Sequence, residues 1–215
     1  MTFPQSTMEE IIESERLMLV SAKERHGKYY THPRGVSVFL SLCVTAVDAD
    51  RMMFGRFHSQ MKKHHMLALF STLRLHKVQA MMNLRQVLEA GASASFAIAN
   101  PEQHHFVDTD QHGILDPSQE LTKKRYAWLR KNCEKKSQWI KEAKEQINSS
   151  AAHANIISAD SVFRIGDAGD QISAPFFDIE DEYFVKADLW LIASVAITLM
   201  DLFYESRPER ARISR

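Results

Sequence analysis

Residues that turn the chain are scarce in this sequence of 215 residues. It has 7 glycines and 6 prolines, about half of ordinary usage. Folds made of many short strands, such as sandwiches and propellers, need more turn residues than this. Because the chain is also long enough to bury a full core, we predict an all-α fold: a helical bundle of five to six helices with a small β-hairpin before the last helix.

The chain also has few cysteines and no net charge. The two cysteines, Cys43 and Cys133, have no CxxC or zinc-like spacing, so we predict free thiols in the reducing cytoplasm. The 27 basic residues equal the 27 acidic residues in number, so no net field attracts a polyanionic partner. The acidic start of the chain lacks the basic and apolar regions of a secretory signal.

Long apolar runs are absent too. The uncharged stretches 36–47 and 189–200 have about twelve residues each, whereas a helix that crosses a bilayer needs about 20. We therefore expect no membrane partner and interpret both stretches as buried core helices.

Signals for helix run through most of the chain. Residues 36–99 contain no proline and two glycines. A single helix of that length would measure about 96 Å at about 1.5 Å per residue. We therefore predict a break at 74–76. We also expect Asp178 to cap the last helix. The predicted helices are 6–27, 36–73 with a bend at Gly55, 77–99, 101–109, 116–150 and 180–206, and the predicted loops are 27–35 and 110–117.

The order of these elements predicts one domain, residues 1–206, with a hairpin inserted at about 158–178 and a flexible basic tail at 207–215. Residues 118–150 contain nine basic and four acidic residues, whereas 160–205 contain ten carboxylates. We expect these two segments to lie against one another, within the chain or in a dimer.

The most informative segment is 78–96, where one face of the predicted helix is apolar except for Arg85 and Glu89. A charge in a core is costly unless it is paired and hydrogen-bonded. The two side chains are one helical turn apart and can meet. Two interpretations stay open: an internal ion pair that tethers a neighbouring element, and a polar pocket with a function.

His153 follows the long helix that we predict to end near residue 150, where it can cap that helix or reach the Arg85–Glu89 pair. The ten histidines contain no HExxH and no pair four residues apart, so we predict no metal and no cofactor. GxGxxG, P-loop and GxSxG motifs are also absent, which removes support for nucleotide binding and α/β-hydrolase chemistry.

The run NLRQVLEAGASASFAIANPEQ resembles the signature helix of HEPN-like helical-bundle proteins of unknown function from bacteria. Those proteins carry an Arg-x-x-x-Glu pair on a central apolar helix and a Ser-x-x-x-His element after a later long helix. The matching residues here are Arg85, Glu89, Ser149 and His153.

This resemblance spans residues 36–205 in element order and is specific over 77–102 and 147–154. It implies an all-helical bundle that commonly dimerises. Some wider HEPN relatives are metal-independent ribonucleases, and some serve defence or toxin–antitoxin systems.

The nuclease branch places an arginine a few residues before its histidine, so that arginine binds phosphate and histidine moves protons. Positions 146–148 hold no arginine, and Arg51 with His58 has the spacing in a different helix. Two hypotheses follow. The leading one is a non-catalytic, homodimeric, cytoplasmic interaction protein with a possible protein partner. The alternative is a metal-independent ribonuclease or toxin that binds RNA and uses Arg85, Glu89 and His153 as catalytic residues.

Overall fold

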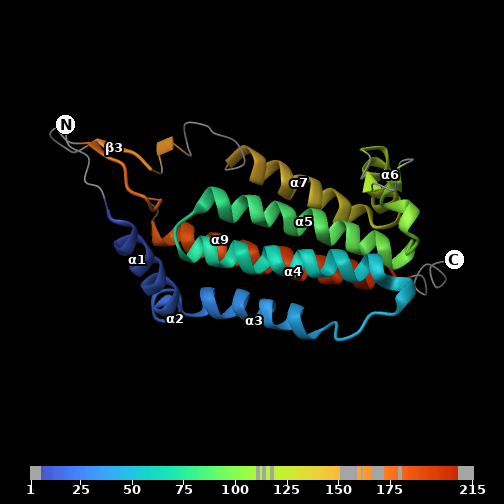
Figure 1. The fold of residues 1–215 in the computed structure, drawn as a ribbon, viewed down its shortest axis with the longest axis horizontal. Coiled ribbons are helices and arrows are strands. Elements are labelled where there is room, and N and C mark those ends of the chain that lie inside the picture. The colour runs from blue at the N-terminus through green and yellow to red at the C-terminus, as the bar shows by residue number, and fades with distance from the viewer. Residues whose placement is uncertain are drawn as a thin grey trace.

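The structure, a computed structural model, describes residues 6–109, 112, 115–116, 119–150, 159–160, 162–165, 172–178 and 181–207. This part of the chain is all-α, as the sequence predicts, and its long helices lie side by side, with α1 and α2 at one end and α6 at the other (Figure 1). The α-helices are α1 (Met8–Val20), α2 (Ala22–His26), α3 (Lys28–Leu42), α4 (Met52–Leu73), α5 (Lys77–Ala99), α6 (Gln119–Asn132), α7 (Glu134–Ser150) and α9 (Glu182–Glu205).

Two short antiparallel strand pairs accompany the helices. Strand β1 (Asp108–Thr109) pairs with β2 (Leu115–Asp116), and β3 (Arg164–Ile165) pairs with β4 (Ile172–Ser173). The helix predicted over 101–109 is wrong, because that stretch forms one 3-10 turn, η2 (Gln103–His105), before β1 begins. The predicted basic tail lies outside the described residues apart from Arg207.

Helix α9 packs against α3, α4 and α5. Its inward side is apolar: Leu189, Ile192 and Leu199 are fully buried. The helix starts at Asp181, whose carboxylate accepts a hydrogen bond from the backbone N–H of Tyr183 at 2.7 Å. The prediction that Asp178 caps this helix is therefore wrong.

Asp178 instead caps α5, whose first residue, Lys77, lies 101 residues earlier in the chain. Its carboxylate accepts a hydrogen bond from the backbone N–H of Lys77, the first residue of α5, and its own N–H donates to the carbonyl of Leu75 at 2.9 Å. The chain reverses here as predicted at 74–76, with Leu75 at a positive φ of 58°. The segment before α9 thus holds the α4–α5 turn in place.

The first part of the chain differs most from expectation. The predicted loop at 27–35 is wrong, because α3 begins directly after Gly27, at a φ of 53°, and continues through Pro33. The predicted helix 36–73 is interrupted after Leu42 and resumes with η1 (Ala49–Arg51) and α4. Gly55 does not mark a bend: a Cβ atom on it would lie 3.3 Å from Cγ2 of Val47, so its missing side chain makes room for the connecting loop.

The long helix predicted over 116–150 is two helices, α6 and α7, that meet at Cys133. Cys133 is buried, and the side-chain amide of Asn132 donates to the carbonyl of Trp128 at 2.8 Å. The N–H of Cys133 also donates to the carbonyl of Leu129 at 2.7 Å, so these two bonds close the last turn of α6. These breaks give eight α-helices in the part of the chain that the structure describes, against the predicted five to six.

Candidate functional site

Arg85 and Glu89 form the predicted ion pair on α5, and the pair is tied to α7. Nε of Arg85 donates to Oε1 of Glu89 at 3.2 Å. A second donor of Arg85 reaches Oδ1 of Asn148 on α7 at 2.7 Å. The arginine therefore bridges its own helix and a helix more than sixty residues away in sequence.

Lys144 closes this network from the other side. Its Nζ lies 3.0 Å from Oε1 of Glu89 and donates to the hydroxyl of Tyr126 on α6 at 3.3 Å. The same ammonium lies 4.9 Å from the centre of the Tyr126 ring, a cation–π contact. Three helices thus meet in one polar cluster, which we call the Arg85–Glu89 network: Arg85, Glu89, Tyr126, Lys144 and Asn148.

The Arg85–Glu89 network is half-buried rather than sealed. The side chains of Arg85 and Glu89 each keep 35% of their surface exposed, and Lys144 keeps 21%. Burial alone would raise the pKa of Glu89, but Lys144 and Arg85 outweigh it and hold that pKa below its ordinary value. Burial likewise opposes the charge of Lys144, and Tyr126 and Glu89 reverse the effect and raise its pKa. Both groups are therefore charged at neutral pH.

A groove with a volume of about 1070 Å³ runs beside the Arg85–Glu89 network, between α6 and α7. Tyr126, Lys144 and Asn148 form part of its wall, so the network lies at its inner side. The charged residues that line the groove are the basic Lys123, Arg130, Lys135, Lys141 and Lys144 and the acidic Glu134, Glu142 and Glu145.

Among the other residues predicted for this site, His153 lies outside the described residues. The described ones do not join the Arg85–Glu89 network. Ser149 is exposed, and its hydroxyl donates to the carbonyl of Gln146 at 2.9 Å. Arg51 binds the carbonyl of Ile98 at 2.8 Å, and His58 is buried elsewhere in the bundle, so these two residues do not form an arginine–histidine site.

Lys144, Asn148 and Tyr126 are not among the residues predicted for this site. A single straight helix over 116–150 gives no reason for α7 to turn back onto α5. A usable signal was present: Lys144 and Asn148 are four residues apart, the same spacing as Arg85 and Glu89, so each pair projects from one side of its helix.

Exposed apolar side chains on α9 form a second candidate site. Tyr183, Trp190, Ile197 and Tyr204 follow one another at intervals of seven residues, and they keep 72%, 57%, 48% and 49% of their surface exposed. We call these four residues the α9 row. The polar residues Lys186, Ser194 and Asp201 lie between them on the same side of the helix. A row of large, exposed apolar side chains is typical of an interaction site.

Helix α3 extends this surface. The ring of His32 lies 6.5 Å from the ring of Trp190, and α3 and α9 run in the same direction (Figure 1). Phe39 is seven residues beyond His32, as Ile197 is beyond Trp190, so Phe39 lies at the level of Ile197. Phe39 and its neighbour Leu42 are also largely exposed.

Helix α9 has a further property. Within the described ranges it is the one helix whose length and hydropathy would also suit a membrane span, and 39% of its most apolar window is buried inside the bundle. This amphipathic burial is what a core helix with one uncovered side shows.

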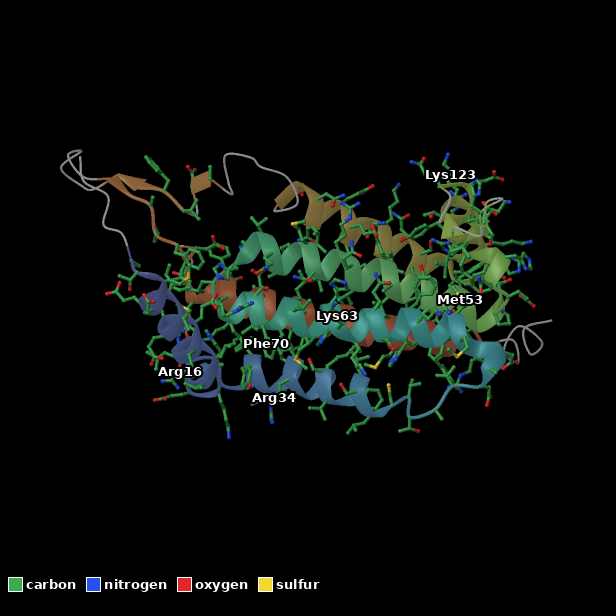
Figure 2. The ribbon with its side chains drawn as sticks, viewed as in Figure 1. Arg16, Arg34, Met53, Lys63, Phe70 and Lys123 are labelled. Atoms are coloured by element: carbon green, nitrogen blue, oxygen red, sulfur yellow. The ribbon has the colours of Figure 1, made fainter. Side chains whose placement is uncertain are left out.

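The two ends of the molecule carry opposite charge. Helix α1 has four glutamates and one arginine, whereas α6 has five basic residues and one glutamate. Figure 2 places Arg16 of α1 and Lys123 of α6 at opposite ends of the bundle. In the described residues one ion pair, Lys136 of α7 with Asp201 of α9 at 3.2 Å, joins the basic segment 118–150 to the acidic segment 160–205. Contact between these segments within a dimer stays a prediction.

Comparisons of the chain with protein-family models, with curated proteins and with solved structures found no match.

Proposed function

We propose that the protein is a non-catalytic interaction protein of the cytoplasm that acts as a homodimer. The observation that carries this proposal is the α9 row, which with Phe39 of α3 leaves large apolar side chains uncovered along one side of the bundle. Monomeric soluble proteins seldom expose contiguous apolar patches of more than a few hundred Å² without an interaction function.

The Arg85–Glu89 network supports the non-catalytic part of the proposal. The guanidinium of Arg85 and the carboxylate of Glu89 both bind groups of the protein itself. Arg85 donates to Glu89 and Asn148, and Glu89 also pairs with Lys144. An arginine held in this way braces α5 against α7. Free thiols at Cys43 and Cys133 are compatible with a reducing compartment.

Size-exclusion chromatography with light scattering tests the homodimer. We expect twice the mass of the 24.7 kDa chain at both low and high salt, because an apolar interface is not screened by ions. A strict monomer under both conditions at micromolar concentration contradicts the proposal.

A metal-independent ribonuclease, of the kind found in defence or toxin–antitoxin systems, is the second candidate, and the groove between α6 and α7 is the observation that favours it. Basic residues outnumber acidic ones in its lining, and Tyr126 and Trp139 add aromatic surface, the combination that single-stranded nucleic acids bind. The HEPN-like resemblance belongs to this candidate, with Arg85, Glu89 and His153 as its catalytic residues.

Incubation with mixed RNA in EDTA tests this second candidate. Cleavage by the wild type that is lost in Arg85→Ala and in His153→Ala, and kept in the exposed control Arg34→Ala, supports a ribonuclease. Absence of cleavage, or cleavage that survives both substitutions, removes these residues from any catalytic role.

A further inference from the structure

We infer that two copies of the chain pair antiparallel through α9, with the α9 row as the centre of the interface. This inference rests on the proposed homodimer and names its surface and its geometry. A second copy is the occupant that the spacing, the exposed area and the charge distribution favour together.

The spacing comes first. Four apolar residues separated by seven positions each form a nearly straight row along a helix, because seven residues are almost two turns. From Tyr183 to Tyr204 the row is about 31 Å long at about 1.5 Å per residue. This is the pattern by which a second long helix packs alongside, and α9 itself is the only partner of matching length and pattern that the described ranges supply.

The exposed area suits a dimer. The α9 row, Phe39 and Leu42 are between 48% and 72% exposed. With about 150–250 Å² for a large aromatic side chain, they leave roughly 600–700 Å² of apolar surface, close to the ~800 Å² that each partner gives to a standard interface. Backbone and rim atoms around these six side chains supply the remainder.

The charges select the antiparallel orientation. The N-terminal end of α9 lies at the acidic end of the molecule, where Lys186 of α9 also reaches the ring of Tyr29. The C-terminal end of α9 lies at the basic end, where Asp201 pairs with Lys136. Antiparallel pairing brings α1 of one copy toward α6 of the other. The four glutamates of α1 then lie near the five basic residues of α6. Parallel pairing would bring like charges together.

The two-fold axis then falls midway along the α9 row, between Trp190 and Ile197. Trp190 of one copy meets Ile197 of the partner subunit, and Tyr183 meets Tyr204 of the partner subunit. Ser194 lies at the axis on the same side of α9, and its small side chain lets the two helices approach closely.

Substitution of Ile197 tests the surface. We expect Ile197→Asp to be monomeric by light scattering, with an unchanged helical circular dichroism spectrum, because it places two charges next to the axis of a desolvated interface. Met82→Asp is the matched control: Met82 is an equally exposed apolar residue on α5, and this variant should remain dimeric. A dimeric Ile197→Asp beside a dimeric wild type overturns the α9 interface and leaves the homodimer standing, whereas a monomeric wild type overturns both.

Disulfide cross-linking tests the orientation and does not depend on Ile197→Asp folding. In a Cys43→Ser background, Tyr183→Cys and an affinity-tagged Tyr204→Cys are oxidised separately and as a mixture. We expect a cross-link in the mixture and none with Tyr183→Cys alone. A cross-link with Tyr183→Cys alone overturns the antiparallel arrangement, and no cross-link in any sample overturns the α9 interface.

Discussion

Gly91 of α5 and Leu199 of α9 are packed so closely that a Cβ atom on Gly91 would lie 2.5 Å from Cδ1 of Leu199. Leu199 is fully buried, so its side chain has little space to turn away. The absence of a side chain at Gly91 therefore sets the distance between α5 and α9.

We predict that Gly91→Ala destabilises the protein by about 1–3 kcal/mol, the usual cost of an overpacked core. Urea unfolding followed by circular dichroism measures it. Gly35→Ala is the control: Gly35 is exposed in α3, nothing lies within 4 Å of its added Cβ, and alanine should stabilise this helix by roughly 0.5–1 kcal/mol. Equal effects of the two substitutions would contradict the close contact.

Asp178→Ala should lower the free energy of unfolding by about 1–2 kcal/mol, because it leaves the first N–H of α5 without its buried acceptor. Asp178→Asn keeps a side-chain oxygen and should lose less. Thermal or urea unfolding of both variants checks the order. The result that counts against the cap is an alanine variant as stable as the asparagine variant.

Glu89→Gln should cost about 1 kcal/mol, a modest figure because solvent screens the half-exposed pair. The pKa of Glu89 is lowered from 4.5, so its contribution is complete above that ordinary value and is lost as the pH falls through the lowered folded-state pKa. Wild type and variant should therefore converge in stability under acid. Glu145→Gln, at an exposed ion pair with Lys141, is the control and should be neutral. No difference between the two variants at pH 7 would show that the Arg85–Glu89 network does not stabilise the fold.

His65 makes stability depend on pH near neutrality. It is fully buried, its Nδ1 lies 2.8 Å from the hydroxyl of Ser37, and burial lowers its pKa from 6.5 to about 4. Unfolded chains bind a proton below pH 6.5 that the folded protein takes up only near pH 4, so stability is complete above 6.5 and falls by about 3 kcal/mol between these values. Burial also lowers the pKa of His26 and of His58, which act in the same direction.

Unfolding midpoints measured from pH 7.5 to pH 4.5 check this effect. His65→Gln should flatten the pH dependence in that window, whereas substitution of the exposed His104 should leave it unchanged. An identical slope in His65→Gln and wild type would mean that the buried imidazole is not the group that titrates.

Breaks between helices were harder to predict than the helices themselves. The turn at 74–76 follows from length alone, because 64 residues of helix cannot fit in the domain. Pro33 and Gly35 favoured a loop at 27–35, but both lie inside α3. A helix tolerates these residues where tertiary packing holds the flanking residues. The break at Cys133 contains neither proline nor glycine. Its local signals are Asn132, which ends α6, and Glu134, the acidic residue in the first turn of α7.

The part of the candidate site that lies on α5 was predictable from the sequence. Arg85 and Glu89 stand out because they interrupt an apolar face of one helix, a pattern contained in local sequence. Lys144 and Tyr126 join them because α6 and α7 fold back onto α5. That fold-back depends on the break at Cys133, which the sequence analysis did not predict. Tertiary partners of a charged pair are therefore less accessible to sequence reasoning than the pair itself.

The late position of α9 in the sequence also constrains the order of events during synthesis. Gly91 emerges from the ribosome 108 residues before Leu199, which at about 5–20 residues per second is a delay of roughly 5–20 s. During that interval the apolar side of α5 lacks its final neighbour, so the nascent chain exposes apolar surface that the folded protein buries.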